Sequence, residues 1–233
     1  MTLLPSTELT LETPADVSVH LVRIGNLGET MTERMAVREI LSADERERSE
    51  RFVRPGLRGR FIYTRATLRH LLAERLNTTP KSLTFEQTKD GRPFLSQTEH
   101  PSQLDFNVTH SGDMALIAIG SSQHRIGIDI EQVREMRDLE QMANRVLTPF
   151  ERAALDQLDE QTHAKFHSNL EQTKRALFFR YWTCKEAYLK ALGTGLQTDM
   201  QRIEAQLTHP NGCLLYTSPS PRDATLSRMP SSA

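Results

Sequence analysis

The sequence predicts an α+β fold made of two similar halves. Its 233 residues are enough for one large domain or for two halves of about a hundred residues each. Strand patterns and helix patterns occur in both halves, and they follow one another in a similar order. The halves share no evident sequence identity, so the duplication is expected in the order of elements.

Strands are predicted where apolar and polar residues alternate, between turns marked by glycine or proline. The expected strands are 17–24, 83–87, 106–111, 114–119 and 125–131. The helices expected from helical periodicity and caps are 29–41, 42–53, 57–76, 139–146, 149–158 and 163–192. Two capping boxes define helix starts, Ser42 with Glu45 and Thr148 with Glu151. The buried side of the long helix over 57–76 is expected to consist of Leu57, Phe61, Leu68, Leu72 and Leu76.

The composition is that of a globular protein with almost no net charge. Apolar residues make up 37% of the chain, and the formal net charge is −1, which argues against a general nucleic-acid-binding protein. Cys184 and Cys213 suggest no disulfide framework. No apolar run has the length of a membrane span, and the N-terminus lacks the features of a signal peptide. A cytoplasmic, monomeric protein is therefore expected.

The stretch from Phe178 to Leu196 contains a helix face of mixed chemistry. The residues that share about half of the helix circumference are Trp182, Lys185, Glu186, Leu189 and Lys190. A core face would not accept lysine and glutamate, and a solvated face needs no tryptophan. The helix is therefore expected to line a polar cleft and to end at Gly193.

A second acidic element is RIGIDIE, residues 125–131. In a strand, Asp129 and Glu131 point to the same side. Two neighbouring carboxylates repel each other unless a cation lies between them, and hard oxygen ligands suit Mg²⁺. With Glu186 as a third carboxylate, the sequence predicts a Mg²⁺ site formed by Asp129, Glu131 and Glu186.

GIDIE at 127–131, followed by WTCKEAYLK at 182–190, resembles the signature pair of the 4'-phosphopantetheinyl transferases of the surfactin-synthetase-activating type. The matching positions are Asp129, Glu131, Trp182, Lys185, Glu186 and Lys190. The resemblance runs from about Ser42 to Leu196, is weak before that stretch, and is lost after about Gly212.

The resemblance implies transfer of 4'-phosphopantetheine from coenzyme A to a serine of an acyl or peptidyl carrier protein, releasing adenosine 3',5'-bisphosphate. Glu186, or a water that it orients, would take the serine proton. Lys190 would stabilise charge on the pyrophosphate, and Lys185 would either do the same or form an ion pair. Trp182 either takes part in the cleft or simply anchors the helix in its wall.

The resemblance also implies a nucleotide site. FNVTHSG, residues 106–112, is similar to a segment of the family in which a hydroxyl residue and a histidine contact the 3'-phosphate. The implied coenzyme A contacts are Arg48, Arg92, Thr109, His110 and Lys190. A phosphate beside His110 would favour its protonated form. Glu45 stands where some members of the family have lysine.

The fold implied by the resemblance is a pseudo-two-fold pair of α+β halves with a cleft between them. We therefore expect an N-terminal half at 1–120 with nucleotide contacts and a C-terminal half at 121–212 with the metal and the catalytic helix. Residues 213–233 lack the strands that close this half in the family. They are expected to be a non-native tail on a truncated half that is less stable, disordered from about Ser218 onward.

Two alternatives remain open from the residues alone. Another Mg²⁺-dependent phosphotransfer enzyme or phosphohydrolase would use the same acids, release inorganic phosphate and ignore carrier proteins. A nucleic-acid-binding module would use the Arg-rich run from Arg46 to Arg75, bind less tightly with rising salt, and not need Asp129. The near-neutral charge argues against the module, so no nucleic-acid or membrane partner is expected.

Overall fold

The structure is a computed structural model that describes residues 4, 6–11, 13–24, 31–158, 169–194, 198–209 and 212–217. The chain forms two compact units. The first comprises Met1–Gln132 and Glu186–Leu196, and the second comprises Val133–Lys185 and Gln197–Ala233. The division falls after Gln132 rather than near residue 120, and residues 186–190, expected in the C-terminal half, belong to the first unit. The combination of helices with antiparallel sheets agrees with the predicted α+β class. The pseudo-two-fold relation and the truncation stay predictions.

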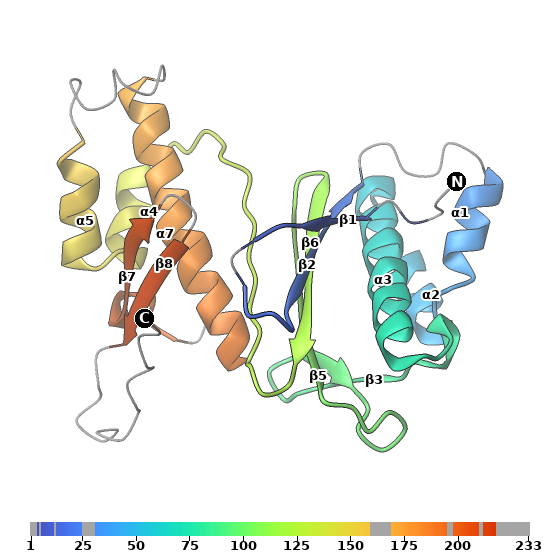
Figure 1. Ribbon diagram of the computed structural model, residues 1–233. Helices are drawn as coiled ribbons and strands as arrows, with labels where there is room; N and C mark the ends of the chain where they lie inside the picture. The colour runs from blue at the N-terminus through green and yellow to red at the C-terminus, as the bar shows by residue number, and fades with distance from the viewer. Residues whose placement is uncertain are drawn as a thin grey trace. The chain divides into compact units, whose positions relative to one another are not determined.

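A four-stranded antiparallel sheet is the centre of the first unit (Figure 1). In spatial order its strands are β1 (Ser6–Leu9), β2 (Ser18–Arg23), β6 (Met114–Ser121) and β5 (Leu104–Ser111). A separate ribbon pairs β3 (Phe85–Gln87) with β4 (Pro93–Leu95). Gly112, with φ of +56°, occupies the tight turn between β5 and β6. The strands predicted over 17–24, 83–87, 106–111 and 114–119 are confirmed, with small differences at their ends.

The long helix of the first unit packs on this sheet. The helices of the unit are α1 (Met31–Arg38), α2 (Ala43–Glu50), α3 (Pro55–Leu76), the short η1 (Pro80–Ser82) and the end of α7. Leu68 and Leu72 of α3 share a buried cluster with Phe106 and Ile117 of the sheet. α3 begins at Pro55, two residues earlier than predicted, because proline is well suited to a first turn. Leu57, in that first turn, remains 38% exposed.

The predicted capping box at the start of α2 is present and joins a larger network. The Glu45 N–H donates to Ser42 Oγ at 3.3 Å, and the Ser42 N–H donates to Glu45 Oε2 at 3.0 Å. The Glu45 carboxylate also pairs with Arg65 and Arg69 of α3, and Arg69 donates to two backbone carbonyls beyond that helix. Burial opposes ionisation of Glu45, but the hydrogen bonds and charges of Arg69 and Arg65 outweigh it and lower the pKa of Glu45. These two arginines of the Arg-rich run therefore have structural partners.

Residues 125–131 are not the predicted strand. They have no regular secondary structure. They lie alongside β5, an edge strand of the sheet, and bond to its side chains. The Ile126 N–H donates to Asp105 Oδ2 at 2.9 Å, and the Ile128 N–H donates to Asn107 Oδ1 at 3.0 Å. The β5 side chains that hold this segment and the start of the next are Asp105, Asn107, Thr109 and Ser111. Alternate backbone N–H groups of this segment therefore bond to side chains of β5, where a strand would bond to the backbone of its neighbour.

The second unit contains α4 (Leu139–Val146), α5 (Pro149–Asp156), the part of α7 (Leu170–Leu192) up to Lys185, η4 (Met200–Arg202), β7 (Ile203–His209) and β8 (Gly212–Thr217). The predicted capping box of α5 is present, with Glu151 N–H donating to Thr148 Oγ1 and Thr148 N–H to Glu151 Oε2. Residues 213–217, expected to be tail, lie in β8 and pair with β7. Residues 163–168 of the expected long helix, and the expected disorder from Ser218, lie outside the described residues.

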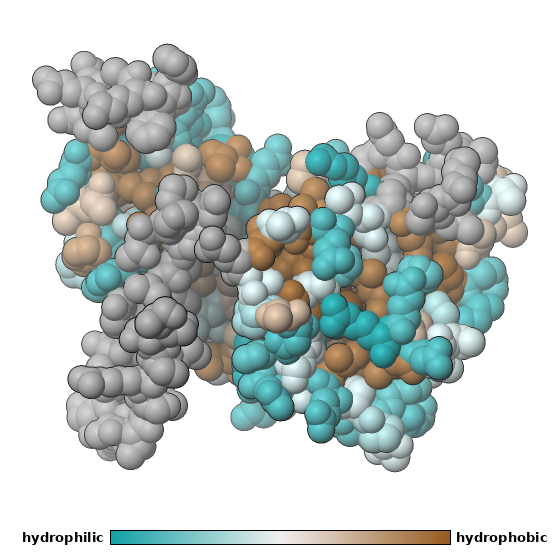
Figure 2. Space-filling view, in the orientation of Figure 1, coloured by the Kyte–Doolittle hydropathy of each residue, from teal (hydrophilic) through white to brown (hydrophobic). Residues whose placement is uncertain are grey.

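The face in Figure 2 shows hydrophilic and hydrophobic residues interspersed over the first unit. Large apolar side chains that are exposed come from many elements: Leu11, Met31, Met35, Val53, Leu57, Met114, Val133, Phe150 and Leu192. Exposed apolar residues of this number are ordinary when they do not form one patch. In the part of the chain that the structure describes, no helix is long and apolar enough to cross a membrane.

Candidate active site

The two sequence motifs meet through a glycine. A Cβ atom added at Gly127 would lie 1.9 Å from the carbonyl oxygen of Ala187 and 2.6 Å from the nitrogen of Ala191. Only a residue without a Cβ allows the two backbones to approach this closely. The glycine of GIDIE therefore brings the following Asp129 beside the last turns of α7, which contain Lys190.

Asp129, Lys190 and Thr109 form the centre of the candidate site. Lys190 Nζ donates to Asp129 Oδ1 at 2.5 Å and to Thr109 Oγ1 at 2.9 Å, and Thr109 Oγ1 donates to Asp129 Oδ1 at 2.8 Å. The Asp129 side chain is 5% exposed and that of Lys190 is 30% exposed. The other carboxylate oxygen, Asp129 Oδ2, is buried and has no hydrogen-bond partner among the described residues. Because an unpartnered buried acceptor is costly, this oxygen is suited to a ligand or cation.

Glu131 and Glu186 add negative charge around Asp129. Glu131 accepts a hydrogen bond from Ser111 Oγ at 2.8 Å. Burial raises the pKa of Glu186, and the charges of Asp129 and Glu131 raise it further, against the opposing charge of Lys190. Across the described ranges, no three acidic, histidine or cysteine side chains converge into a ready-made metal site. The predicted metal ligands are therefore brought together as an acidic group rather than as a complete set of ligands.

Arg60 and Lys190 place positive charge near His110. His110 is exposed at the end of β5. Neighbouring protein atoms that partly exclude water lower its pKa, and the positive charges of Arg60 and Lys190 lower it further. A bound phosphate would offset the charges of Arg60 and Lys190 and so favour the protonated form of His110. Arg60, on α3, was not singled out in the sequence, because its place in an Arg-rich run does not reveal that its charge acts on His110.

Arg92 has protein partners on every side. Its guanidinium donates to the carbonyls of Lys190 at 2.9 Å and Ala191 at 2.6 Å, at the end of α7. It also donates to both carboxylate oxygens of Asp105, at 2.9 and 2.8 Å, and to the carbonyl of Ile126 at 2.9 Å. The side chain is 8% exposed. The structure thus shows Arg92 bonded within the fold, whereas the resemblance implies that it contacts the nucleotide.

Arg48 lies on α2, with its guanidinium carbon 5.3 Å from the ring centre of Phe61. It lines a polar hollow with Asp44, Glu47, Arg51, Phe52 and Gln87. Among the contacts of the described residues, none joins Arg48 to Asp129 or Lys190. Its implied contact with coenzyme A stays a prediction.

Lys185, predicted to be catalytic, is enclosed in the second unit. Its side chain is 0% exposed, and Nζ lies 2.5 Å from Glu151 Oε2, whose side chain is also 0% exposed. The same ammonium donates to the carbonyls of Val146 at 2.7 Å and Met200 at 3.1 Å. Burial lowers the pKa of Lys185, against the hydrogen bond and charge of Glu151. A core face accepts this lysine because Glu151 neutralises it and two carbonyls accept its other protons, so the structure assigns Lys185 to the scaffold.

Trp182 also lies within the second unit. It is half-buried, and its ring centre lies 6.0 Å from that of Phe178. This packing supports the simpler of the two predicted roles, in which the tryptophan anchors the helix.

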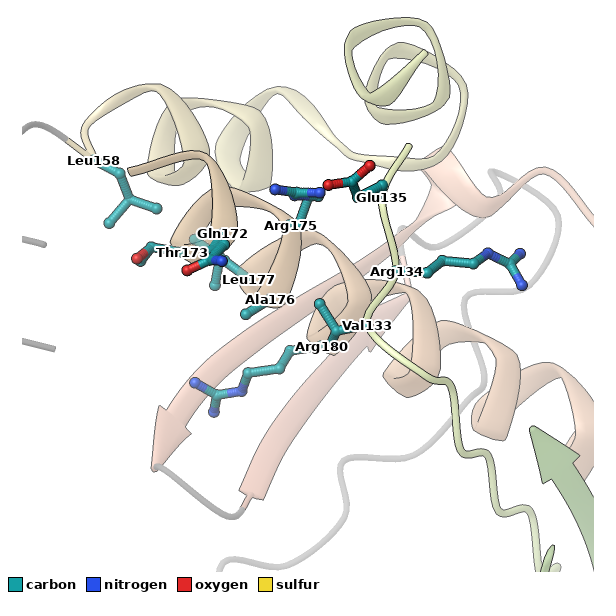
Figure 3. Close-up of a pocket in the computed structure, with 10 residues that line it drawn as sticks. All are labelled: Val133, Arg134, Glu135, Leu158, Gln172, Thr173, Arg175, Ala176, Leu177 and Arg180. Atoms are coloured by element: carbon teal, nitrogen blue, oxygen red, sulfur yellow. The ribbon is translucent and has the colours of Figure 1, made fainter. Parts of the chain in front are cut away.

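A separate hollow in the second unit contains none of the predicted site residues (Figure 3). Its volume is about 750 Å³. The residues that line it are Val133, Arg134, Glu135, Leu158, Gln172, Thr173, Arg175, Ala176, Leu177 and Arg180. The lining combines apolar side chains with arginines and lacks the paired acids and lysine described above, so we assign it no catalytic role.

Comparison with known proteins identifies the family. Residues 125–229 match the family model described as the 4'-phosphopantetheinyl transferase superfamily, and residues 29–122 match one described as 4'-phosphopantetheinyl transferase, N-terminal. The chain is 38% identical over 202 residues to the 4'-phosphopantetheinyl transferase HetI of Nostoc sp., which covers 87% of this chain and 79% of that protein.

Two further relatives have related names. A putative 4'-phosphopantetheinyl transferase of Synechocystis sp. is 34% identical over 164 residues, which are 70% of this chain and 61% of that protein. A phosphopantetheinyl transferase of Thraustochytrium sp. is 28% identical over 216 residues, which are 90% of this chain and 72% of that protein. The chain thus spans less than two thirds of the Synechocystis relative.

The chain belongs to the 4'-phosphopantetheinyl transferase superfamily. The predicted family and the predicted enzyme class are confirmed, and coenzyme A is the substrate that this family uses. The surfactin-synthetase-activating type, the site residues and the metal remain predictions.

Proposed function

We propose that the chain transfers 4'-phosphopantetheine from coenzyme A to a serine hydroxyl of an acyl or peptidyl carrier protein. The observation that supports this most directly is the contact between three separate motifs. Lys190 Nζ of WTCKEAYLK lies 2.5 Å from Asp129 Oδ1 of GIDIE, and both atoms bond to the hydroxyl of Thr109 in FNVTHS.

In this reaction the serine oxygen forms a bond to the β-phosphorus of coenzyme A. The bond from that phosphorus to the bridging oxygen breaks, and adenosine 3',5'-bisphosphate leaves. Phosphoryl transfer depends mainly on positioning and charge neutralisation. Glu186 is our candidate to accept the serine proton, directly or through a water. Its carboxylate lies close enough to Asp129 and Glu131 to feel their charges, and a carboxylate within reach of the hydroxyl can accept its proton.

Lys190 is placed to neutralise charge on the phosphates. Its ammonium has three N–H donors, and two of them bond to Asp129 and Thr109. The side chain is 30% exposed, so the third donor is accessible to a phosphate oxygen. Lys190 is therefore our candidate both for a substrate contact and for the ion-pair partner that holds Asp129 in place.

We propose Mg²⁺ as the metal, held by Asp129, Glu131 and Glu186. The unpartnered Oδ2 of Asp129 and the repulsion that raises the pKa of Glu186 both describe a site that a divalent cation would stabilise. Carboxylate oxygens are ligands that Mg²⁺ accepts. When bound, the ion supplies charge neutralisation at the pyrophosphate.

At the nucleotide end we propose Arg48, Thr109 and His110, and we add Arg60. Arg60 and His110 lie close enough to influence each other's charge, and both types of side chain donate to phosphate oxygens. The 3'-phosphate of coenzyme A is the group that such a pair would bind. Arg92 is not included here, because its guanidinium is bonded to Asp105 and to backbone carbonyls.

The mass of a carrier protein tests this proposal. The chain is incubated with coenzyme A, Mg²⁺ and an unmodified carrier, and the carrier is expected to gain one phosphopantetheine group. A carrier with its acceptor serine changed to alanine is the control and should gain nothing. Release of inorganic phosphate without carrier modification would instead indicate a phosphohydrolase. Salt-sensitive binding to nucleic acid, unaffected by Asp129→Asn, would indicate the binding module.

A further inference from the structure

The guanidinium of Arg92 joins the backbone elements that present the candidate catalytic side chains. The two carbonyls that it binds at the end of α7 are those of Lys190 itself and its neighbour. The carbonyls of the last helical turn lack partners within the helix and are the negative end of its dipole. A buried arginine therefore both satisfies them and fixes the position of the turn that contains Lys190.

Asp105 extends this link to the other two elements. Its carboxylate binds Arg92, and its Oδ2 also accepts the Ile126 N–H at 2.9 Å. Asp105 lies on β5, as does Thr109, and Ile126 precedes the GIDIE segment that contains Asp129. The Arg92–Asp105 pair thus connects the three elements that supply Thr109, Asp129 and Lys190.

We propose that Arg92 and Asp105 are positioning residues of the transferase site, and that Arg92 acts through the protein rather than by contact with the nucleotide. This inference rests on the proposed function. Lysine would keep the positive charge of Arg92, but it has no planar fork that can reach both helix carbonyls, Asp105 and Ile126. A direct electrostatic contact with phosphate would largely survive such a change.

The test is a comparison of Arg92→Lys and Asp105→Asn with the unchanged chain. Both variants are expected to lower kcat in carrier modification by about 10²-fold, the cost of misplacing catalytic groups by about 1 Å. The KM for coenzyme A, and its Kd by calorimetry, should change by a smaller factor than kcat, and by the same factor for dephospho-coenzyme A. The double variant should lose little more than either single variant, because both act through one link.

Arg125→Lys is the matched control. Arg125 also reaches the end of α7, but by one hydrogen bond of 3.4 Å from an exposed side chain, so its kcat should remain near that of the unchanged chain. If Arg92→Lys instead weakens coenzyme A more than dephospho-coenzyme A with kcat unchanged, Arg92 contacts the nucleotide and the inference is overturned. An unchanged kcat in both Arg92→Lys and Asp105→Asn would overturn it as well.

Hydrogen exchange separates this inference from the proposed function, because it needs no turnover. In Arg92→Lys and Asp105→Asn, the amides of residues 126–128 and of the last turn of α7 should exchange faster, while those of α4 and α5 should not change. Should Arg92→Lys fail to fold, Asp105→Asn alone decides by the same readout. Unchanged protection at 126–128 overturns the positioning role even if the unchanged chain modifies carriers. Failure of the unchanged chain to modify carriers refutes only the proposed function.

Discussion

Two lysines five positions apart on α7 form ion pairs of the same length in very different surroundings. Lys185 Nζ and Lys190 Nζ each lie 2.5 Å from a carboxylate oxygen. In the Lys185–Glu151 pair both side chains are 0% exposed, and the ammonium also donates to two carbonyls. In the Lys190–Asp129 pair the lysine is 30% exposed, and one oxygen of Asp129 has no partner among the described residues.

The difference distinguishes a pair with all its bonds made inside the protein from a pair with unused bonding capacity. Lys185 uses all three of its donors within the protein, so it has none left for a substrate. Lys190 is partly exposed, and one buried oxygen of Asp129 has no hydrogen-bond partner among the described residues. We therefore expect bound phosphate or metal to use the bonding capacity that this pair leaves free. An ion pair with unused bonding capacity is therefore the better indicator of a functional site than burial or short distance alone.

The largest expected effect is on stability, from Lys185→Met. Removing one partner of a buried ion pair should lower the free energy of unfolding by about 3–5 kcal/mol, because Glu151 is left charged and buried. Trp182 is the only tryptophan of the chain and lies in the second unit, so its fluorescence during urea unfolding reports on this unit. Lys185→Met/Glu151→Gln is the matched control and should recover part of the loss. A loss below about 1 kcal/mol would mean that the pair is not a scaffold element.

Asp129→Asn should have the opposite profile. Carrier modification should fall by about 10²–10³-fold, the range seen when one electrostatic contact to a transition state is removed. The unfolding curve followed by Trp182 should shift little, because Asp129 belongs to the first unit. Excess chelator should abolish the activity of the unchanged chain, and added Mg²⁺ should restore it. Full turnover in the variant or in chelator would refute the metal site.

A smaller effect is expected at the nucleotide end. His110→Ala should raise the KM for coenzyme A by about 10-fold, the value of one hydrogen bond to a charged group. It should change the KM for dephospho-coenzyme A little, because that substrate lacks the 3'-phosphate. His124→Ala, which removes an exposed histidine beside Asp16, is the control. Equal losses for both substrates would assign His110 a structural role.

The smallest effect is a pH dependence that comes from a second satisfied network. The pKa of Glu45 is lowered in the folded state, so the unfolded state binds more protons as the pH falls below the ordinary glutamate value of about 4.5. The stabilisation by Glu45 is therefore complete above that pH and is lost as the pH falls through the folded pKa. Far-UV circular dichroism during urea unfolding should show a weaker acid dependence in Glu45→Gln. Identical slopes in both proteins would contradict this.

Local signals in the sequence predicted much of the fold. The capping boxes at Ser42 and Thr148 were readable because both partners lie within four residues of each other. The strands around Gly112 and the helix stop at Gly193, which has φ of +75°, were also predicted correctly. Each of these features depends on neighbours in the sequence.

The failures depended on distant partners. Residues 125–131 alternate like a strand, but their backbone donors bind side chains of β5 about twenty positions earlier. Lys185 was assigned to a polar face because Glu151, which makes its burial tolerable, is far away in the sequence. Arg60 and the close approach at Gly127 likewise became evident only from the packing.

The most direct test of this comparison is the rate of carrier modification per folded molecule in Lys190→Met and in Lys185→Met/Glu151→Gln. We predict that Lys190→Met folds but loses about 10²-fold or more of its kcat, while the scaffold double variant, once folded, keeps a kcat close to that of the unchanged chain. A fully active Lys190→Met, or a folded but inactive scaffold variant, would contradict the assignment of the two pairs.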